Sequence, residues 1–177
     1  INNIAVLMNR FILSLFIGFG FSQTMQLTTS EINYHGSHPL HSWIGTSNEA
    51  TGQITYDANA NTGTATVEVA LNSFDSRISS RDSNMLYYTD ALDYPTVRFI
   101  STSIELYGDS LKISGDLSFH GVTKNITTVA SANIDGGVKV AGSFAIELSD
   151  YNVKRPTFLL MQIANTIKID YAFQAGE

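Results

Sequence analysis

Three histidines, His35, His38 and His41, follow one another at intervals of three residues. Imidazole nitrogens are common ligands of metal ions, and on a helix this spacing would place all three rings on one face. Gly36 and Pro39 stand between them, however, and both residues disfavour a helix. On a strand, neighbours three residues apart point to opposite sides. We therefore predict turn histidines and no metal site.

Other patterns that would support catalysis are missing from the sequence. It contains no cysteine, no Gly-x-Ser-x-Gly elbow, no phosphate-binding glycine loop and no His-Glu-x-x-His motif. Asp82 and Asp90 lie near Arg77 and Arg81, and we expect them to act as helix-cap and ion-pair partners. We expect His120 to be solvated or bonded to a turn carbonyl. The sequence therefore predicts no catalytic residue, no cofactor and no enzyme.

Length and charge restrict the class of protein further. A chain of 177 residues suits one domain whose core is large enough to be stable without disulfides. Its net charge is −6 and only 15% of its residues are charged. The whole chain therefore offers no basic field to neutralise phosphates or hold an anionic membrane surface, and nucleic acid is not an expected partner.

The first residues have the pattern of an export signal. Met8-Asn9-Arg10 precedes an apolar run over residues 11–21, and small residues then stand before Gln23. The run is shorter than the roughly 20 apolar residues of a membrane span. We predict an upstream extension over residues 1–7, a cleaved signal peptide over 8–22 and a mature domain over 23–177 without a membrane span. An uncleaved anchor and a buried helix are the alternatives.

The mature chain shows a period of two in its apolar residues, which indicates strands with one buried face. In residues 138–148, Val140 and Phe144 fall on one face while Lys139 and Ser143 fall on the other. Asn, Asp and Gly at residues 57–63 and 133–137 predict hairpin turns. The other predicted strands are residues 26–34, 42–47, 52–56, 65–73, 97–106, 111–119, 125–134 and 167–173. This all-β pattern of about eight strands predicts a sandwich or barrel, and closure is favoured because it removes exposed edges.

Residues 80–95 interrupt the strand pattern and predict a short helical excursion. Ser80 is the expected N-cap, and Asp93 with Pro95 marks the expected end. We expect the apolar side of the excursion to lie against the open end of a barrel. That side would contain Met85, Leu86, Ala91 and Leu92.

The interior of such a barrel has two possible states. A barrel of about eight strands is either filled by side chains or holds one small ligand, and apolar periodicity does not separate the two. Large apolar side chains that could contact a ligand are those at the inward-facing alternate positions of the strands and those in the helical excursion. They are Trp43, Phe74, Met85, Leu86, Phe99, Leu117, Phe119, Phe144, Ile146 and Phe158.

Two motifs in the centre of the chain resemble those of the YceI-like family. One covers residues 80–86 (SRDSNML) and 94–104 (YPTVRFISTSI), and the other residues 114–124 (SGDLSFHGVTK). A third match is the glycine and phenylalanine of residues 142–144 with LSDY at 148–151, whereas residues 41–49 depart from the usual start of the family. The resemblance implies an extended, lipocalin-like antiparallel barrel in the periplasm that binds a polyisoprenoid chain. It also implies that Arg81 and Asp82 tie the excursion to the barrel and that residues 120–124 form a tight turn.

These observations give three hypotheses. The first is a periplasmic binding or carrier protein that holds an isoprenoid or a similar long-chain lipid in the barrel. The second is a structural or stress-response module with a filled core, which acts through its surface. The third is a metal-binding enzyme, which requires the three N-terminal histidines to converge. A homodimer is compatible with each.

Overall fold

A computed structural model describes residues 22–57, 62–133 and 137–176. The predicted upstream extension and nearly all of the predicted signal peptide lie outside these ranges, as do the central residues of two predicted turns. The strands are β1 (Gln23–His38), β2 (His41–Ser47), β3 (Thr51–Asp57), β4 (Thr62–Ala70), β5 (Thr96–Tyr107), β6 (Ser110–Phe119), β7 (Val122–Asn133), β8 (Val138–Glu147), β9 (Thr157–Phe158), β10 (Met161–Gln162) and β11 (Thr166–Ala175). The helical elements are the 3₁₀ turns η1 (Leu71–Ser73) and η2 (Leu148–Tyr151) and the α-helix α1 (Ser79–Tyr88).

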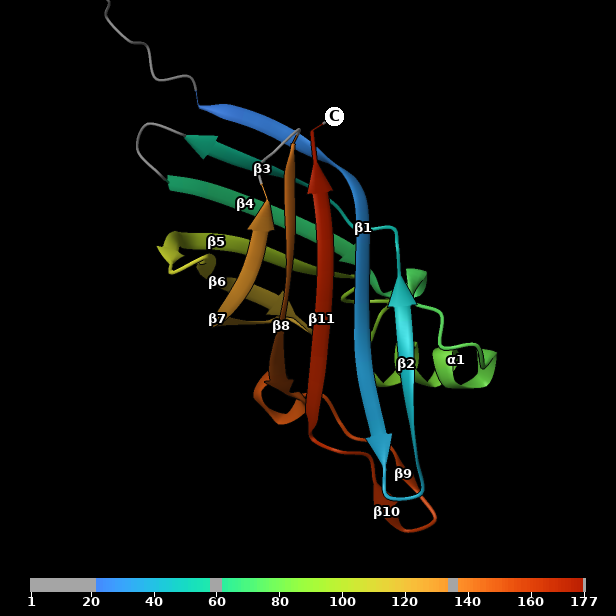
Figure 1. Cartoon of the computed structure of the whole chain (residues 1–177). Helices are drawn as coiled ribbons and strands as arrows, with labels where there is room; N and C mark the ends of the chain where they lie inside the picture. The colour runs from blue at the N-terminus through green and yellow to red at the C-terminus, as the bar shows by residue number, and fades with distance from the viewer. Residues whose placement is uncertain (1–21, 58–61, 134–136, 177) are drawn as a thin grey trace, which may run out of the picture.

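The long strand β1 closes the sheet into a barrel because it is paired along both edges. One edge pairs with β11 from Leu27 to His35. The other edge pairs first with β3, through residues 23–26, and then with β2, through residues 32–38. A closed antiparallel ring of eight strands therefore runs β1-β3-β4-β5-β6-β7-β8-β11, and β2 extends one side of it (Figure 1). The predicted all-β barrel with one short helix is confirmed.

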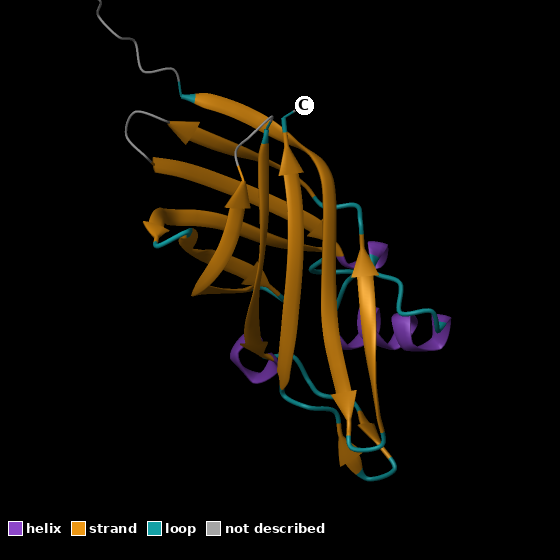
Figure 2. Ribbon diagram, viewed as in Figure 1, coloured by secondary structure: helices purple, strands orange, loops and turns teal. Residues whose placement is uncertain are grey.

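Alternation of side chains sets which face of each strand is buried. In β8, Val138 and Val140 are buried while Lys139 and Ala141 are exposed. The remaining inward positions of β8 are partly buried, and β6 and β11 alternate in the same way. The inward faces of the strands form an apolar interior. Most of the chain is in strands (Figure 2). A slip of one residue would turn every apolar side chain outward, so this pattern fixes the register.

The predicted strand over residues 65–73 is too long at its end. The observed strand β4 ends at Ala70, and the next residues form η1. The backbone N–H of Leu71 donates to the carbonyl of Pro95 at 2.9 Å, and the side chain of Leu71 is buried. This bond continues the β4–β5 register, but Pro95 has no N–H to donate in return, so the ladder ends there and the Leu71 carbonyl accepts from the Phe74 N–H at 3.4 Å instead.

The helical excursion is present, but its ends differ from the prediction. Its N-cap is Ile78, without a capping side chain, so Ser80 is not the cap. The helix ends at Tyr88 because Asp90 adopts a left-handed backbone, with φ of 46°. The expected stop at Asp93 and Pro95 therefore comes several residues too late.

The packed side of the excursion also differs at one position. Met85, Leu86 and Ala91 pack against the apolar core, as predicted. Leu92 follows the left-handed Asp90 and is fully exposed, so its assignment to the packed side was wrong. The helix lies beside β2 (Figure 1).

One corner of the barrel, between the β6–β7 turn and η2, is tightly packed. We call it the closed corner and define it by Phe119, His120, Leu148, Tyr151 and Val153. Tyr151 is 2% exposed, and its ring centroid lies 5.5 Å from that of Phe119. Nδ1 of His120 lies 2.8 Å from the Tyr151 carbonyl, and Nε2 lies 2.9 Å from a carboxylate oxygen of Asp90. The expected bond of this histidine to a carbonyl is confirmed. The expected turn is present but shorter than residues 120–124, because β7 begins at Val122 and only residues 120 and 121 lie between the strands.

Candidate ligand-binding cavity

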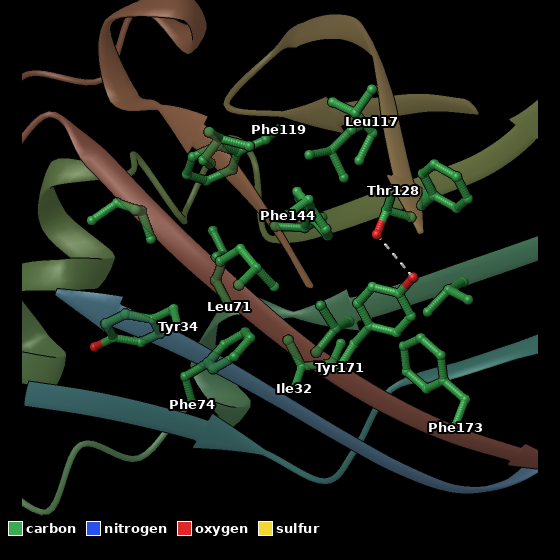
Figure 3. A pocket seen from close by; sticks show the side chains of 18 of the residues that line it. Ile32, Tyr34, Leu71, Phe74, Leu117, Phe119, Thr128, Phe144, Tyr171 and Phe173 are labelled. Atoms are coloured by element: carbon green, nitrogen blue, oxygen red, sulfur yellow. Dashed lines mark hydrogen bonds between the residues drawn. The ribbon is translucent and has the colours of Figure 1, made fainter. Parts of the chain in front are cut away.

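A cavity of about 800 Å³ occupies the barrel interior. Side chains from the barrel strands, β2, α1 and the segment before β9 line it, and most of them are apolar. In Figure 3, Leu71, Leu117, Phe144 and Phe173 point into one shared space from four different elements. Pockets that hold small molecules have volumes of roughly 300–1,000 Å³, so this cavity has the size of a binding site. The interior is not filled by side chains.

The structure places nine of the ten predicted contact residues on the cavity wall. Leu86 is the exception, because it packs into the core beneath α1 and does not line the cavity. Phe158 lies at the rim and is 56% exposed. That these residues touch a ligand stays a prediction. The nine are Trp43, Phe74, Met85, Phe99, Leu117, Phe119, Phe144, Ile146 and Phe158.

Two tyrosines and a threonine that the sequence reasoning did not select also face the cavity. The Thr128 hydroxyl lies 2.9 Å from the Ser143 carbonyl and 3.2 Å from the Tyr171 hydroxyl (Figure 3). Burial raises the pKa of Tyr171, and it likewise raises the pKa of Tyr34, whose hydroxyl is buried beside the Trp43 indole. Both phenols are therefore neutral at pH 7. Inward parity in β1, β7 and β11 was the signal that could have found them.

Aromatic rings lie flat against the barrel wall because glycines stand beneath them. A Cβ added at Gly36 would lie 2.3 Å from the Trp43 ring, and one added at Gly45 would lie 2.1 Å from the Tyr34 ring. Each is much shorter than a van der Waals contact. The pairs with this arrangement are Gly36 with Trp43, Gly45 with Tyr34, Gly115 with Phe99, and Gly142 with Tyr171. The rings occupy the space of the missing side chains, which leaves the centre of the barrel open.

Charged side chains are scarce on this wall. Among the described residues that line the cavity, Arg81 and Asp109 carry formal charges. The Arg81 guanidinium lies 5.3 Å from the Trp43 ring centroid, and its Nε donates to the Ser76 hydroxyl at 2.9 Å. The backbone N–H of Ser76 donates to Asp82 at 3.1 Å. Arg81 thus ties α1 to β2 of the barrel, as expected, whereas Asp82 secures the segment before the helix.

The three N-terminal histidines are held in separate roles. Nε2 of His35 lies 2.6 Å from a carboxylate oxygen of Asp170, and His41 stacks beside Trp43. His38 accepts the Leu40 N–H at Nδ1, so Nε2 carries the proton and donates to backbone carbonyls of the β9–β10 hairpin. Within residues 22–57, 62–133 and 137–176, no three His, Asp or Glu side chains gather to hold a metal ion. The convergence that the enzyme hypothesis requires does not occur.

Both the sequence and the fold of the chain are similar to those of known proteins. Residues 24–175 match the model of the YceI-like domain family. The chain belongs to this family. Protein YceI of Escherichia coli O17:K52:H18 is 35% identical to it over 135 residues, which are 70% of each chain. Protein YceI of Salmonella newport is 32% identical over 133 residues, which are 69% of this chain and 70% of the relative.

Two solved structures share the fold of this YceI-like barrel at lower identity. Burkholderia cenocepacia BcnA superimposes with a TM-score of 0.75 and 19% identity, over 82% of this chain and 96% of its own. A polyisoprenoid binding domain from Saccharophagus degradans gives 0.67 and 15%, over 88% and 99%. In the part of the YceI-like chain that the structure describes, no helix has the length and apolar character needed to span a bilayer.

Proposed function

We propose that the chain is a periplasmic carrier that holds one isoprenoid or similar long-chain lipid inside its barrel. The observation that carries the proposal is the open apolar cavity of about 800 Å³. Two further observations support it. The chain is a member of the YceI-like family, and a solved protein of the same fold is described as a polyisoprenoid binding domain. The export pattern of residues 8–22 supports the periplasm as its location.

The wall favours an apolar chain over a compact polar molecule. Each 100 Å² of apolar ligand surface that leaves water contributes about 2.5 kcal/mol. The phenols of Tyr34 and Tyr171 are neutral, and Arg81 is already engaged by Ser76 and Trp43. Binding energy therefore comes from burial and not from ion pairing. We expect affinity for the lipid to change little with salt concentration.

The same features argue for a protein that acts by binding. Catalysis needs an acid, a base or a nucleophile within hydrogen-bond reach of a reacting atom. Asp109 is exposed at the β5–β6 turn, and the described wall pairs no carboxylate with a histidine. We propose that the protein carries out no reaction on its ligand.

Organic extraction of the gently purified protein, followed by lipid mass spectrometry, tests the carrier function. We expect one class of long-chain apolar lipid at close to one molecule per chain. Lipid-free protein that also fails to take up an added polyisoprenol would refute the proposal. A filled-core module would give that result, but the observed cavity already argues against it.

A pair of neighbouring positions on β8 gives a matched control. Phe144 lines the cavity, whereas Ala145 is exposed on the outer face. We expect Phe144→Asp to abolish loading because it places a carboxylate in the apolar wall, and Ala145→Asp to load normally. If Phe144→Asp does not fold, Ala65→Phe adds an uncharged ring inside the cavity, and Ala141→Phe on the outer face is its control. Equal loading of folded inward and outward variants would show that the lipid binds elsewhere.

A further inference from the structure

One end of the barrel exposes a cluster of apolar side chains. The turn between β1 and β2 contributes Leu40, and the β9–β10 hairpin contributes Phe158, Leu159, Leu160 and Met161. We call these five residues the apolar tip. All five are exposed, and the Leu160 side chain is 98% exposed. Both hairpins lie at the same end of the molecule, far from the C-terminus (Figure 1).

The apolar tip is fixed in place and is continuous with the cavity. Nε2 of His38 lies 3.1 Å from the Phe158 carbonyl and 3.3 Å from the Met161 carbonyl. The N–H of Ala164 donates to the Ser37 carbonyl at 2.8 Å, which holds the end of the same hairpin. His38 and Phe158 also line the cavity. Phe158 therefore belongs both to the tip and to the cavity wall, and it joins the two surfaces.

The backbone at the tip is unfavourable for the residues found there. Leu159 and Leu160 have φ of 49° and 66°. Left-handed backbone costs an ordinary L-residue about 1–2 kcal/mol, and Asn or Gly normally occupies such turns. Strain of this kind persists mainly at functional positions. At this turn it presents two leucine side chains to the solvent.

The charge around the tip differs from that of the whole chain. The chain has 16 acidic residues, yet segments 32–48 and 151–169 contain none. Lys168 is paired with Asp170 at 2.8 Å, whereas Lys154 and Arg155 form no ion pair with any described residue. These two cations directly precede the β9–β10 hairpin. Lys154 is exposed, and Arg155 donates to the Ile163 carbonyl at 3.3 Å. An apolar tip preceded by two cations without acidic partners among the described residues suits a surface with an apolar interior and anionic head groups.

We infer that the apolar tip docks on a lipid bilayer that carries anionic head groups, so that the cavity opens onto the bilayer. A second copy of the chain is a poorer partner for this surface. In a two-fold dimer through the tip, Lys154 and Arg155 would approach the same cations of the other chain. The bilayer offers opposite charge to the cations and hydrocarbon to the leucines.

Vesicle co-sedimentation of the purified protein tests this inference. The probes are phosphatidylcholine vesicles, with and without about one quarter phosphatidylglycerol. We expect stronger binding to the anionic vesicles and loss of that preference at high salt, because salt screens exposed charges. Equal or absent binding to the two kinds of vesicle would overturn the inference.

Variants of the tip separate the contribution of the leucine side chains to vesicle binding from the contribution of the cations. Replacing Leu159 by Asn and Leu160 by Gly keeps a turn that suits left-handed backbone and removes both leucine side chains. We expect the double variant to bind anionic vesicles at least about tenfold more weakly. Lys154→Gln should weaken binding about fivefold, and Lys124→Gln, an exposed lysine on β7, should leave it unchanged. Wild-type binding by the folded double variant would overturn the inference.

Two further measurements identify the competing explanations. Sedimentation equilibrium of the free protein detects self-association, and a dimer that the double variant disrupts, without vesicle binding, would assign the tip to a second copy. Lipid extraction from the same samples keeps this test independent of the carrier function. A protein that is loaded with lipid but ignores vesicles would contradict only the docking inference. A protein that docks but never holds lipid would contradict only the carrier function.

Discussion

Two tight turns of this protein each have two successive residues with positive φ, but their surroundings are very different. His120 and Gly121 join β6 to β7 with φ of 50° and 72°, and Leu159 and Leu160 join β9 to β10 with φ of 49° and 66°. The first turn belongs to the closed corner, where the histidine ring contacts a carbonyl and a carboxylate. The second carries two exposed leucines. Turns with similar φ angles thus belong to tight packing at one place and expose apolar side chains at the other.

The largest expected difference is in the free energy of unfolding when an aromatic side chain is removed from the closed corner or from the apolar tip. Tyr151→Ala empties part of the closed corner and should lower the free energy of unfolding by about 3–5 kcal/mol. Phe158→Ala at the half-exposed tip should lower it by less than about 1 kcal/mol. Urea unfolding at pH 7 measures both values. Equal losses would show that the two regions do not differ in packing.

Alkaline pH should affect the closed corner next. Burial, with a smaller contribution from Asp150, raises the pKa of Tyr151 to about 12. Below pH 10 the folded and unfolded states both keep this proton, but between pH 10 and 12 only the unfolded state loses it. Tyr151 alone should therefore lower the free energy of unfolding by about 1.4 kcal/mol per pH unit in that window, in addition to the loss from Tyr34 and Tyr171, whose pKa values burial also raises.

Tyr151→Phe removes the contribution of Tyr151, leaves those of Tyr34 and Tyr171, and is the control. The Tyr151 hydroxyl is buried and makes no hydrogen bond within the described part of the chain, so its removal should not destabilise the protein at pH 7. Denaturant titrations of both proteins from pH 8 to 12 measure the difference between them. Parallel curves for the two proteins would mean that Tyr151 ionises normally in the folded state.

Asparagine at the first position of each turn should change the stability of the protein in opposite directions. His120→Asn keeps a residue that tolerates positive φ but loses contacts to Tyr151 and Asp90, and should cost about 1–2 kcal/mol. Leu159→Asn relieves strain and should stabilise the protein by up to about 1 kcal/mol. Thermal unfolding of the two variants checks the signs. A loss of stability in Leu159→Asn would show that the leucine packs usefully at the tip.

The smallest expected change in stability comes from substitutions at the second position of each turn, Gly121 and Leu160. Gly121→Ala should cost about 1 kcal/mol or slightly more, because the added Cβ would lie 2.7 Å from the Tyr94 ring on a left-handed backbone. Leu160→Gly should raise stability by about 1 kcal/mol or less, since it removes strain but also adds freedom to the unfolded chain. The same unfolding series measures both. Changes of equal sign would contradict the contrast between the turns.

Most of the fold could be predicted from the sequence because alternation is a local signal. Val138, Val140, Ile113 and Leu117 all face inward as the period of two requires. The turn at His120 could also be expected, because Gly121 is a residue that left-handed backbone favours. The β9–β10 hairpin could not be predicted, because leucines at its turn carry no turn signal.

The site was predictable only in part, for a different reason. The alternation of residues along a strand shows that a side chain points inward. It does not show whether an aromatic ring extends across the interior or lies along the wall. Trp43 leaves space because its partner across the strands is Gly36, which depends on the pairing of β1 with β2. Leu86 was assigned to the cavity because a helix pattern does not show which apolar residues reach the surface of the core. An open interior therefore became evident only with the structure.

The capacity of this barrel depends on atoms that are absent. At Gly36, Gly45, Gly115 and Gly142 a single methyl group would force a ring away from the wall and into the space that a ligand would occupy. A change from glycine to alanine is conservative by most measures. Here it would narrow the interior, because the added methyl group would displace the neighbouring ring. Evolution could therefore narrow or close the interior one methyl group at a time, without replacing any of the aromatic residues that line the cavity.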